Sequence, residues 1–370
     1  MKFILKANML TIALVLLTSC QSFNKDQYTI LVGTYTKQDS KGIYTYRSDK
    51  KTMDFKELSS TKVDNPSFVI LDKSQKNAYA VSEMVNKEAF VNAFKFDKKK
   101  GTLNYISKSK VGRGPCHVNI NNKYNFLTTA NYKSGTMNVI RIKDNGTLMV
   151  SNEMYFYKGT GPDSIRQEAA HAHCTQWSRD GKYLFVSDLG SDRLYRYTIN
   201  EEKDAEHLLI TKGHVKLPDG TGPRHFIFNK EGNKMYLISE LSGHLMTFDY
   251  KDGDLTLTQD LIADSQQARG SADIHLSPDE KFLYTSHRLK EDGVSIFKLD
   301  EAGNAQKIAY QPTGSHPRNF AISPDGHWLL VACLKDNRIE FYKRDLSTGL
   351  LTLTDKTIKV SLPTCIQFVQ

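Results

Sequence analysis

The sequence predicts an all-β fold, a seven-bladed β-propeller with four antiparallel strands in each blade. Three observations support this prediction. A six-residue pattern recurs seven times, each repeat has room for four short strands, and the last repeat stops where the N-terminal segment lacks one strand. Internal repeats of about 20–50 residues are typical of solenoids and propellers.

The recurring pattern begins with proline or a small residue and continues as an apolar strand. Its copies are Pro66–Leu71, Pro115–Ile120, Ala172–Trp177, Pro223–Phe228, Ser271–Leu276, Pro317–Ile322 and Pro363–Phe368. Successive copies start 46 to 57 residues apart, which is the size of a propeller blade.

Each repeat reads as four strands separated by turns that contain Gly, Asn or Asp. In the repeat from Pro223, the expected strands are His225–Asn229, Met235–Leu241, Leu245–Tyr250 and Leu255–Leu261. Short apolar runs bounded by such residues are typical of β-hairpins.

The two ends of the chain are expected to complete one blade together. The segment from residue 28 to about residue 64 supplies three strands, and Ile366–Val369 can supply the missing innermost strand. This pairing would close the ring and leave no free edge between the first and last blades. Residues 28–370 are therefore predicted to form a single domain.

The N-terminus has the pattern of an export signal. Lys2 and Lys6 precede an apolar stretch that is too short to span a bilayer comfortably, and Leu17–Cys20 resembles the bacterial lipobox. We expect residues 1–19 to be a cleaved signal peptide, Cys20 to carry a lipid and residues 20–27 to be a tether. The protein would then be exported and anchored in the bacterial cell envelope, facing the periplasm or the surface. An ordinary secretory signal is the alternative.

The composition excludes several function classes. The net charge of +9 favours anionic partners in general, but the lysines are scattered through turns without a nucleic-acid recognition motif, so no nucleic acid is predicted as a partner. No phosphate-binding loop, nucleophile elbow or zincin motif is present. The only contact expected with a membrane is the lipid anchor.

Neither a metal nor a cofactor is predicted. His171 and His173 have a spacing that places two side chains on one face of a strand, but no third ligand is identified by its spacing. The four cysteines after Cys20 fit no disulfide framework and lie within apolar strand patterns, which indicates buried free thiols.

Antiparallel connectivity places a candidate site at the central channel. The start of each inner strand and the turn after each second strand lie on the same face of the propeller. The second repeat residues are Ser67, Cys116, His173, Arg224, Ala272, Arg318 and Thr364, and the third are Phe68, His117, Cys174, His225, Asp273, Asn319 and Cys365. The residues expected at the ends of the second strands are Glu83, Asn131, Asp188, Glu240, His287 and Cys333, with Arg288 next to His287. Charged residues that converge on a channel mouth indicate a site, although such networks also hold blades together.

Several segments, in order and in phase with the blades, resemble one known family. They are Gly33–Thr36, Gly114–His117, Ala130–Tyr132, His171–His173, Asp188–Asp192, Gly222–His225, Ser239–Leu241 and His316–Arg318. Residues 28–370 are similar to the 6-phosphogluconolactonase/carboxymuconate-cyclase family, whose fold is the seven-bladed propeller. The resemblance implies catalytic roles for His171 or His173, for Arg224 and for Glu240, with a further arginine at Arg288 or Arg318.

The leading hypothesis is hydrolysis of a small anionic or sugar lactone by a monomer. Glu240 or His173 would activate water, and Arg224 would stabilise the oxyanion. The predicted substrate-binding residues are His117, Asp188, His225, Asp273, Arg288 and Arg318. The alternatives are a lactonising cyclase that acts on an unsaturated dicarboxylate, and a non-catalytic envelope propeller that binds a sugar or a protein.

Overall fold

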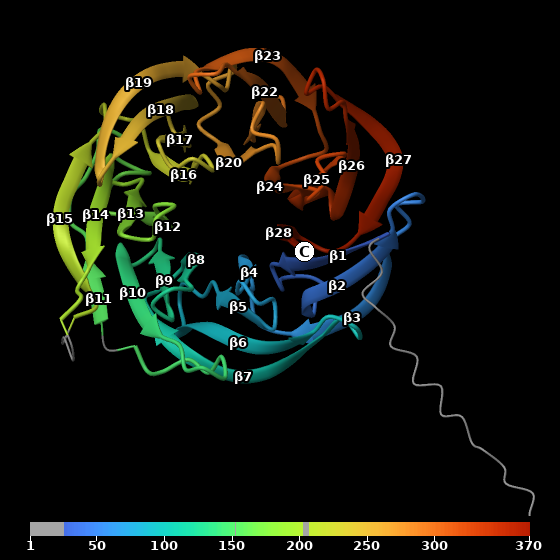
Figure 1. Cartoon of the computed structure of the whole chain (residues 1–370), viewed down its shortest axis with the longest axis horizontal. Helices are drawn as coiled ribbons and strands as arrows, with labels where there is room; N and C mark the ends of the chain where they lie inside the picture. The colour runs from blue at the N-terminus through green and yellow to red at the C-terminus, as the bar shows by residue number, and fades with distance from the viewer. Residues whose placement is uncertain (1–25, 152, 203–206) are drawn as a thin grey trace, which may run out of the picture.

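The structure is a computed structural model that describes residues 26–151, 153–202 and 207–370. Its strands form seven four-stranded antiparallel sheets arranged as blades around a central axis, as predicted (Figure 1). Among the described residues, the one helical turn is η1 (Leu334–Asp336) in the seventh blade, and no helix is long and apolar enough to cross a membrane. The predicted signal peptide and Cys20 lie outside the described residues.

The blades are numbered along the chain, and the strands of each are given from the axis outward. Blade 1 contains β28 (Pro363–Val369), β1 (Gln27–Thr34), β2 (Gly42–Asp49) and β3 (Lys56–Lys62); blade 2 contains β4 (Val69–Leu71), β5 (Asn77–Ser82), β6 (Ala89–Asp97) and β7 (Thr102–Val111); blade 3 contains β8 (Pro115–Asn121), β9 (Phe126–Asn131), β10 (Thr136–Arg141) and β11 (Glu153–Phe156). Blade 4 contains β12 (Ala172–Trp177), β13 (Tyr183–Asp188), β14 (Arg193–Ile199) and β15 (Leu209–Lys216); blade 5 contains β16 (Pro223–Phe228), β17 (Lys234–Ser239), β18 (His244–Lys251) and β19 (Asp254–Ile262). Blade 6 contains β20 (Ser271–Leu276), β21 (Phe282–His287), β22 (Gly293–Leu299) and β23 (Ala305–Pro312); blade 7 contains β24 (Pro317–Ile322), β25 (Trp328–Cys333), β26 (Arg338–Arg344) and β27 (Leu351–Lys359).

The C-terminal strand closes the ring, as the sequence predicted. β28 is the innermost strand of blade 1 and pairs antiparallel with β1, from Thr29 opposite Val369 to Thr34 opposite Pro363. Figure 1 shows β28 beside β1 at the axis, so the first and last parts of the chain share one sheet. The pairing removes the two free edges that an open ring would expose.

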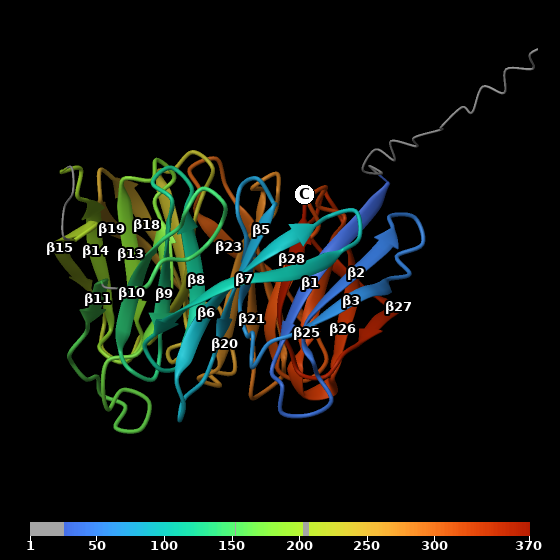
Figure 2. The same cartoon turned by 90° about the horizontal axis from the view of Figure 1, so that it is seen from below.

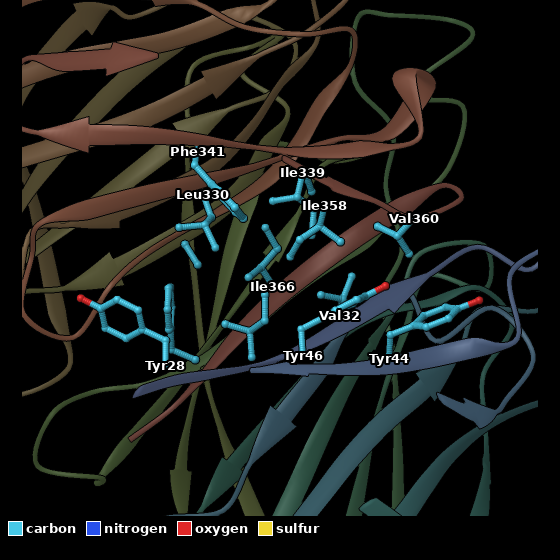
Figure 3. Close-up of a cluster of buried hydrophobic side chains, with 14 of the residues drawn as sticks. Tyr28, Val32, Tyr44, Tyr46, Leu330, Ile339, Phe341, Ile358, Val360 and Ile366 are labelled. Atoms are coloured by element: carbon cyan, nitrogen blue, oxygen red, sulfur yellow. The ribbon is translucent and has the colours of Figure 1, made fainter. Parts of the chain in front are cut away.

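The hydrophobic core consists of layers between neighbouring blades. The described residues form seven buried clusters, one at each interface between adjacent blades. Figure 3 shows the layer between blades 7 and 1, where Val32 and Ile366 meet Leu330 and Ile339. Because this layer joins β28 and β1 to blade 7, the closing blade is held by side-chain packing as well as by strand pairing.

A β-bulge recurs near the start of the inner strands. In blades 3, 4, 5 and 7 the pairing register skips the second repeat residue, so that His117 follows Pro115 in the pairing of β8 with β9. The skipped residues are Cys116, His173, Arg224 and Arg318. A bulge changes the direction of a side chain within a strand. The same bulge in these four blades therefore turns the four skipped residues toward the axis.

The turns and connections gather on two opposite faces of the disc (Figure 2). One face carries the connections between blades together with the turns between the second and third strands. We call it the site face. The other face carries the remaining turns and the beginning of β1 at Gln27, one residue before its predicted start.

Candidate active site

A cavity of about 320 Å³ opens at the axis on the site face. Its lining residues are Tyr35, Glu83, Cys116, Tyr132, Arg166, His173, Glu240 and Arg318. They come from blades 1, 2, 3, 4, 5 and 7 and from the connection between β11 and β12. A larger hollow of about 450 Å³ lies at the outer rim beside Phe90 and Tyr105, where the charged side chains are at the surface. The axial cavity instead gathers buried charged groups, and such convergence is typical of active sites.

Glu240 is the centre of an arginine cluster. Its Oε1 atom accepts a hydrogen bond of 2.6 Å from Arg166 Nη2, its Oε2 atom lies 2.9 Å from Arg224 Nε, and Arg288 Nη2 is 3.4 Å from Oε1. Burial raises the pKa of this carboxyl, but Arg288, Arg224 and Arg166 outweigh burial and hold the pKa at about 2. Glu240 is therefore a permanent carboxylate and a weak proton acceptor.

Arg224 and Arg288 contact Glu240 but do not line the cavity. Arg224 is 2 % exposed, and its Nη1 atom donates to the carbonyl of Ala272. Arg288 Nε donates to the carbonyl of Gly270 at 2.8 Å. Gly270 directly precedes β20, and Ala272 is its second residue. These two arginines therefore hold Glu240 in place while they join blades 5 and 6.

His173 is a neutral imidazole in the cavity wall. Burial is the largest cause that lowers its pKa well below the ordinary value, followed by electrostatic interaction with Arg224, His225 and Arg318. Its Nε2 atom lies 4.0 Å from Glu240 Oε2, and its Nδ1 atom lies 3.8 Å from Cys116 Sγ. Neither contact is a strong hydrogen bond, so neither ring nitrogen of the neutral imidazole is tied to these two partners.

Arg318 presents its guanidinium group to the cavity. The group lies 5.6 Å from the centre of the Tyr35 ring, and its one ion pair within the described ranges is with Glu83, at 4.0 Å. The Tyr35 hydroxyl lies 3.1 Å from both oxygens of Glu83. Burial opposes the charge of Arg318, but Tyr35 and Glu83 raise its pKa above the ordinary value. Arg318 is therefore charged, and most of its donors remain available to a ligand.

His171 lies next to the cavity rather than in its lining. Its ring stacks on Tyr132 with 4.3 Å between ring centres, whereas His173 meets the same tyrosine edge-on. The His171 Nδ1 atom is 2.9 Å from the Tyr132 carbonyl, and Nε2 is 3.2 Å from Glu168. No group of three or more His, Cys, Asp or Glu side chains in the described part of the chain is arranged to hold a metal ion.

His117, His225 and Asp273 lie together in the channel and outside the cavity lining. His225 Nδ1 is 2.7 Å from Asp273 Oδ1, and the rings of His117 and His225 are 5.5 Å apart. Asp273 also accepts from the side chain of Asn319 and lies 2.9 Å from His275 Nε2. These contacts join the inner strands of blades 5, 6 and 7. In the structure, the residues at the third repeat position thus form a network of contacts that joins neighbouring blades.

Asp188 does not occupy the position in blade 4 that Glu240 occupies in blade 5. Pairing of Ala172 with Asp188 and of Pro223 with Ser239 makes Leu189 the counterpart of Glu240. Asp188 is fully buried, where it accepts from the backbone N–H groups of His171 at 2.6 Å and of Gly190 at 3.0 Å. A shift of one residue along a strand points the side chain to the other face. Asp188 therefore shapes the turn beside His171 and does not reach the cavity.

The position equivalent to Glu240 in other blades identifies three cavity residues that the predicted site omitted: Glu83, Tyr132 and Tyr35. The residue 17 positions after a repeat start is Glu83, Tyr132, Leu189, Glu240, Arg288 or Leu334. Tyr35 occupies the equivalent place in blade 1, because Thr34 pairs with Pro363. Cys116, a second repeat residue, was interpreted only as a buried thiol. Arg166 lies in a connection without a counterpart in other repeats, so the sequence pattern contains no signal for it.

Comparison with known proteins agrees with this architecture. The family described as Lactonase, 7-bladed beta-propeller, matches residues 29–368. A Formosa agariphila protein named 6-phosphogluconolactonase is 35% identical over 331 residues, which cover 87% of this chain and 94% of the relative. A solved Bacteroides fragilis structure, provisionally named a 6-phosphogluconolactonase, is 46% identical with a TM-score of 0.91 and covers 94% of this chain and 99% of that one. The structure of a periplasmic gluconolactonase from Pseudomonas aeruginosa is 28% identical with a TM-score of 0.88, at 93% and 99% coverage. This chain therefore belongs to the lactonase family of seven-bladed β-propellers, a family of carboxylic ester hydrolases.

Proposed function

We propose that this protein hydrolyses a sugar lactone by adding water to the ring ester. The observation that carries the proposal is the presence of a neutral histidine, His173, and a charged arginine, Arg318, in the lining of one small cavity. Hydrolysis of an ester requires a proton acceptor for water and a donor for the oxyanion that forms. One cavity supplies both.

His173 is the proposed general base. It accepts a proton from the attacking water while the water oxygen forms a bond to the carbonyl carbon. The tetrahedral intermediate then expels the ring oxygen, which takes the proton back from His173, and the products are a carboxylic acid and an alcohol. Glu240 is the weaker candidate because its three arginine contacts leave it little basicity. Its carboxylate, 4.0 Å from His173 Nε2, would stabilise the imidazolium as it forms.

Arg318 is the proposed oxyanion donor. Its guanidinium group faces the cavity, and its only ion pair among the described residues is long. Arg224 was the candidate from sequence, but it is fully buried and bound to Glu240 and Ala272. Arg224 and Arg288 therefore act as positioning residues that keep Glu240 ionised beside His173.

An aldonolactone is the proposed substrate class. The Formosa agariphila relative is named for a phosphorylated gluconolactone and the Pseudomonas aeruginosa relative for gluconolactone itself. The predicted signal peptide would place this protein in the cell envelope, and the Pseudomonas aeruginosa relative is described as periplasmic. Export favours a lactone that occurs outside the inner membrane.

A panel of lactones tests the proposal. The purified full-length protein would be assayed in a pH-stat with gluconolactone, 6-phosphogluconolactone and a muconolactone, against the spontaneous rate of each. Enzyme-dependent opening of a sugar lactone, lost in Arg318→Gln, is the expected result. Turnover of muconolactone alone would indicate the lactonising cyclase. Binding of a lactone without turnover would indicate a non-catalytic propeller.

A further inference from the structure

The connection between β11 and β12, residues 157–171, brings one arginine into the cavity from outside the repeat pattern. Arg166 leaves this connection between blades 3 and 4 and reaches Glu240 at the end of β17 in blade 5. It is the one cavity-lining residue that belongs neither to an inner-strand start nor to the turn after a second strand. The position of the Arg166 side chain therefore depends on the contacts that fix the backbone of this connection.

Two side chains fix the backbone on either side of Arg166. Asp163 Oδ1 accepts hydrogen bonds of 3.0 Å from the N–H groups of Ile165 and Arg166. The buried Gln167 donates through Nε2 to the Leu189 carbonyl at 2.9 Å and to Asp192 at 2.8 Å. A residue held between two such anchors is positioned in advance for a ligand.

Asp163 also joins two distant parts of the site face. Its second oxygen, Oδ2, pairs with Arg269 on the connection between β19 and β20. This ion pair links the connection that precedes blade 4 to the connection that precedes blade 6. It therefore gives the backbone beside Arg166 a further anchor in addition to Gln167.

The side chain of Arg166 keeps donors free. Its Nη2 atom is used by Glu240 at 2.6 Å and by the Tyr132 hydroxyl at 3.5 Å, while Nε and Nη1 make no hydrogen bond within the described ranges. The side chain is 35% exposed, compared with 2% for Arg224 and 6% for Arg288. Arg166 can thus keep its bond to Glu240 and still offer N–H groups to a bound molecule.

The site also has more positive than negative charge. Among the residues that the structure describes, Glu240 and Glu83 are the carboxylates that form ion pairs with the four guanidinium groups of Arg166, Arg224, Arg288 and Arg318. Histidine does not add a positive charge here, because burial keeps His173 neutral. An excess of guanidinium groups around a small cavity favours an anionic ligand, especially a phosphate or carboxylate that can accept two parallel hydrogen bonds.

We infer that an N–H group of Arg166 that Glu240 leaves free, on Nε or on Nη1, binds an anionic group on the lactone, a phosphate or a carboxylate remote from the ring ester. The inference rests on the proposed function and adds that the enzyme prefers an anionic sugar lactone to a neutral one. Arg166 determines this preference, and Asp163 and Gln167 position it.

The test is a selectivity ratio. The ratio of kcat/KM for 6-phosphogluconolactone to that for gluconolactone would be measured for the full-length wild-type protein and for Arg166→Gln, with a glucarolactone as the carboxylate-bearing probe. We expect Arg166→Gln to lower the ratio by about tenfold or more, since a charge-assisted hydrogen bond to the anionic group is lost, and Arg166→Lys to lower it less. A loss for only one anionic lactone identifies its group as the ligand.

The matched control is Arg113→Gln, which removes one exposed positive charge from the site face but does not touch the cavity. An equal fall of the ratio in both variants, or no fall in Arg166→Gln, would overturn the inference. If the wild type opens no lactone, the proposed function fails, and calorimetry with 6-phosphogluconate then decides on the subsite. Binding that is lost in Arg166→Gln and kept in Arg113→Gln supports the subsite, and unchanged or absent binding overturns it.

Discussion

Glu240 of blade 5 accepts a hydrogen bond of 2.6 Å from Arg166, which belongs to the connection between blades 3 and 4. The same carboxylate is in contact with Arg224 and Arg288. One carboxylate therefore ties together three arginines from different parts of the ring. Its main role in this arrangement is to hold positive charge beside His173 in a fixed geometry.

Replacing Glu240 by glutamine should lower the stability of the protein and its rate of lactone turnover. The amide keeps the shape but leaves three guanidinium groups without their shared counter-charge, and removing one partner of a buried ion pair costs about 3–5 kcal/mol. We expect a clear fall in Tm and a loss of turnover of about a hundredfold. Thermal denaturation and initial rates measure both. Glu88→Gln is the control, because Glu88 pairs with Lys110 at the surface and its loss should have little effect.

The pH profile should lack the acidic limb that an ordinary histidine produces. Burial lowers the pKa of His173 well below its usual value. The neutral, basic form of the imidazole is therefore already present in mildly acidic solution. We expect kcat/KM to stay nearly constant from roughly pH 5.5 to 7.5. His173→Gln should lose most of the activity across this whole range. A limb near pH 6.5 in the wild type that disappears in His173→Gln would contradict the assigned protonation state.

Arg318 should affect kcat more than KM. If its guanidinium group binds the oxyanion, Arg318→Gln loses an interaction made mainly in the transition state, and kcat should fall by roughly 10²–10³-fold. Arg318→Lys keeps the charge and should recover part of the loss. Steady-state kinetics on a sugar lactone separate the two parameters. A change confined to KM would show that Arg318 binds substrate instead.

Gly190 should not tolerate a larger residue. A Cβ atom at Gly190 would lie 1.8 Å from the carbonyl oxygen of Ala169 and 2.9 Å from the His171 backbone nitrogen. Gly190→Ala must therefore displace the segment that leads into β12 and His173, and we expect losses of both stability and activity. Gly213→Ala is the control: nothing lies within 4 Å of its Cβ position, although its φ of +82° makes about 1 kcal/mol of strain unavoidable. Equal Tm values for the two variants would contradict the steric argument.

The free energy of unfolding should fall as the solution becomes more acidic. Burial lowers the folded-state pKa of His117, His173 and His225, in the last case to about 4. The unfolded chain takes up protons as the pH falls through about 6.5, while the folded protein does not. Each histidine can therefore lower the free energy of unfolding by up to about 1.4 kcal/mol per pH unit below 6.5. Tm measured between pH 7.5 and 5 should show this decline, and a constant Tm would contradict it.

The fold could be predicted because its signal repeats. Six of the seven repeat starts coincide with the first residue of an observed inner strand, and only β4 begins later, at Val69. The strands expected at His225–Asn229 and Ile366–Val369 begin earlier in the structure, at Pro223 and Pro363. Ring closure also followed from counting strands. The repeated Pro and Gly-containing turns constrain the backbone locally, so such a pattern survives in the structure.

The site was harder to predict because it depends on phase and on an irregular connection. The bulge that turns Arg224 and Arg318 toward the axis leaves no mark in composition. An error of one residue selected Asp188 in place of Leu189, and Asn131 in place of the cavity residue Tyr132. Arg166 reaches Glu240 only through the path of residues 157–171. Long-range contacts of this kind are set by tertiary structure and not by local periodicity.

Ring opening in H₂¹⁸O tests the central claim most directly. The full-length wild-type protein and His173→Gln would be mixed with gluconolactone or 6-phosphogluconolactone, and the early product would be analysed by mass spectrometry. We predict opening well above the spontaneous rate, with one ¹⁸O atom in the new carboxylate and with most of the acceleration lost in His173→Gln. Opening no faster than the spontaneous rate, or an unsaturated product without ¹⁸O, would contradict hydrolysis at this site.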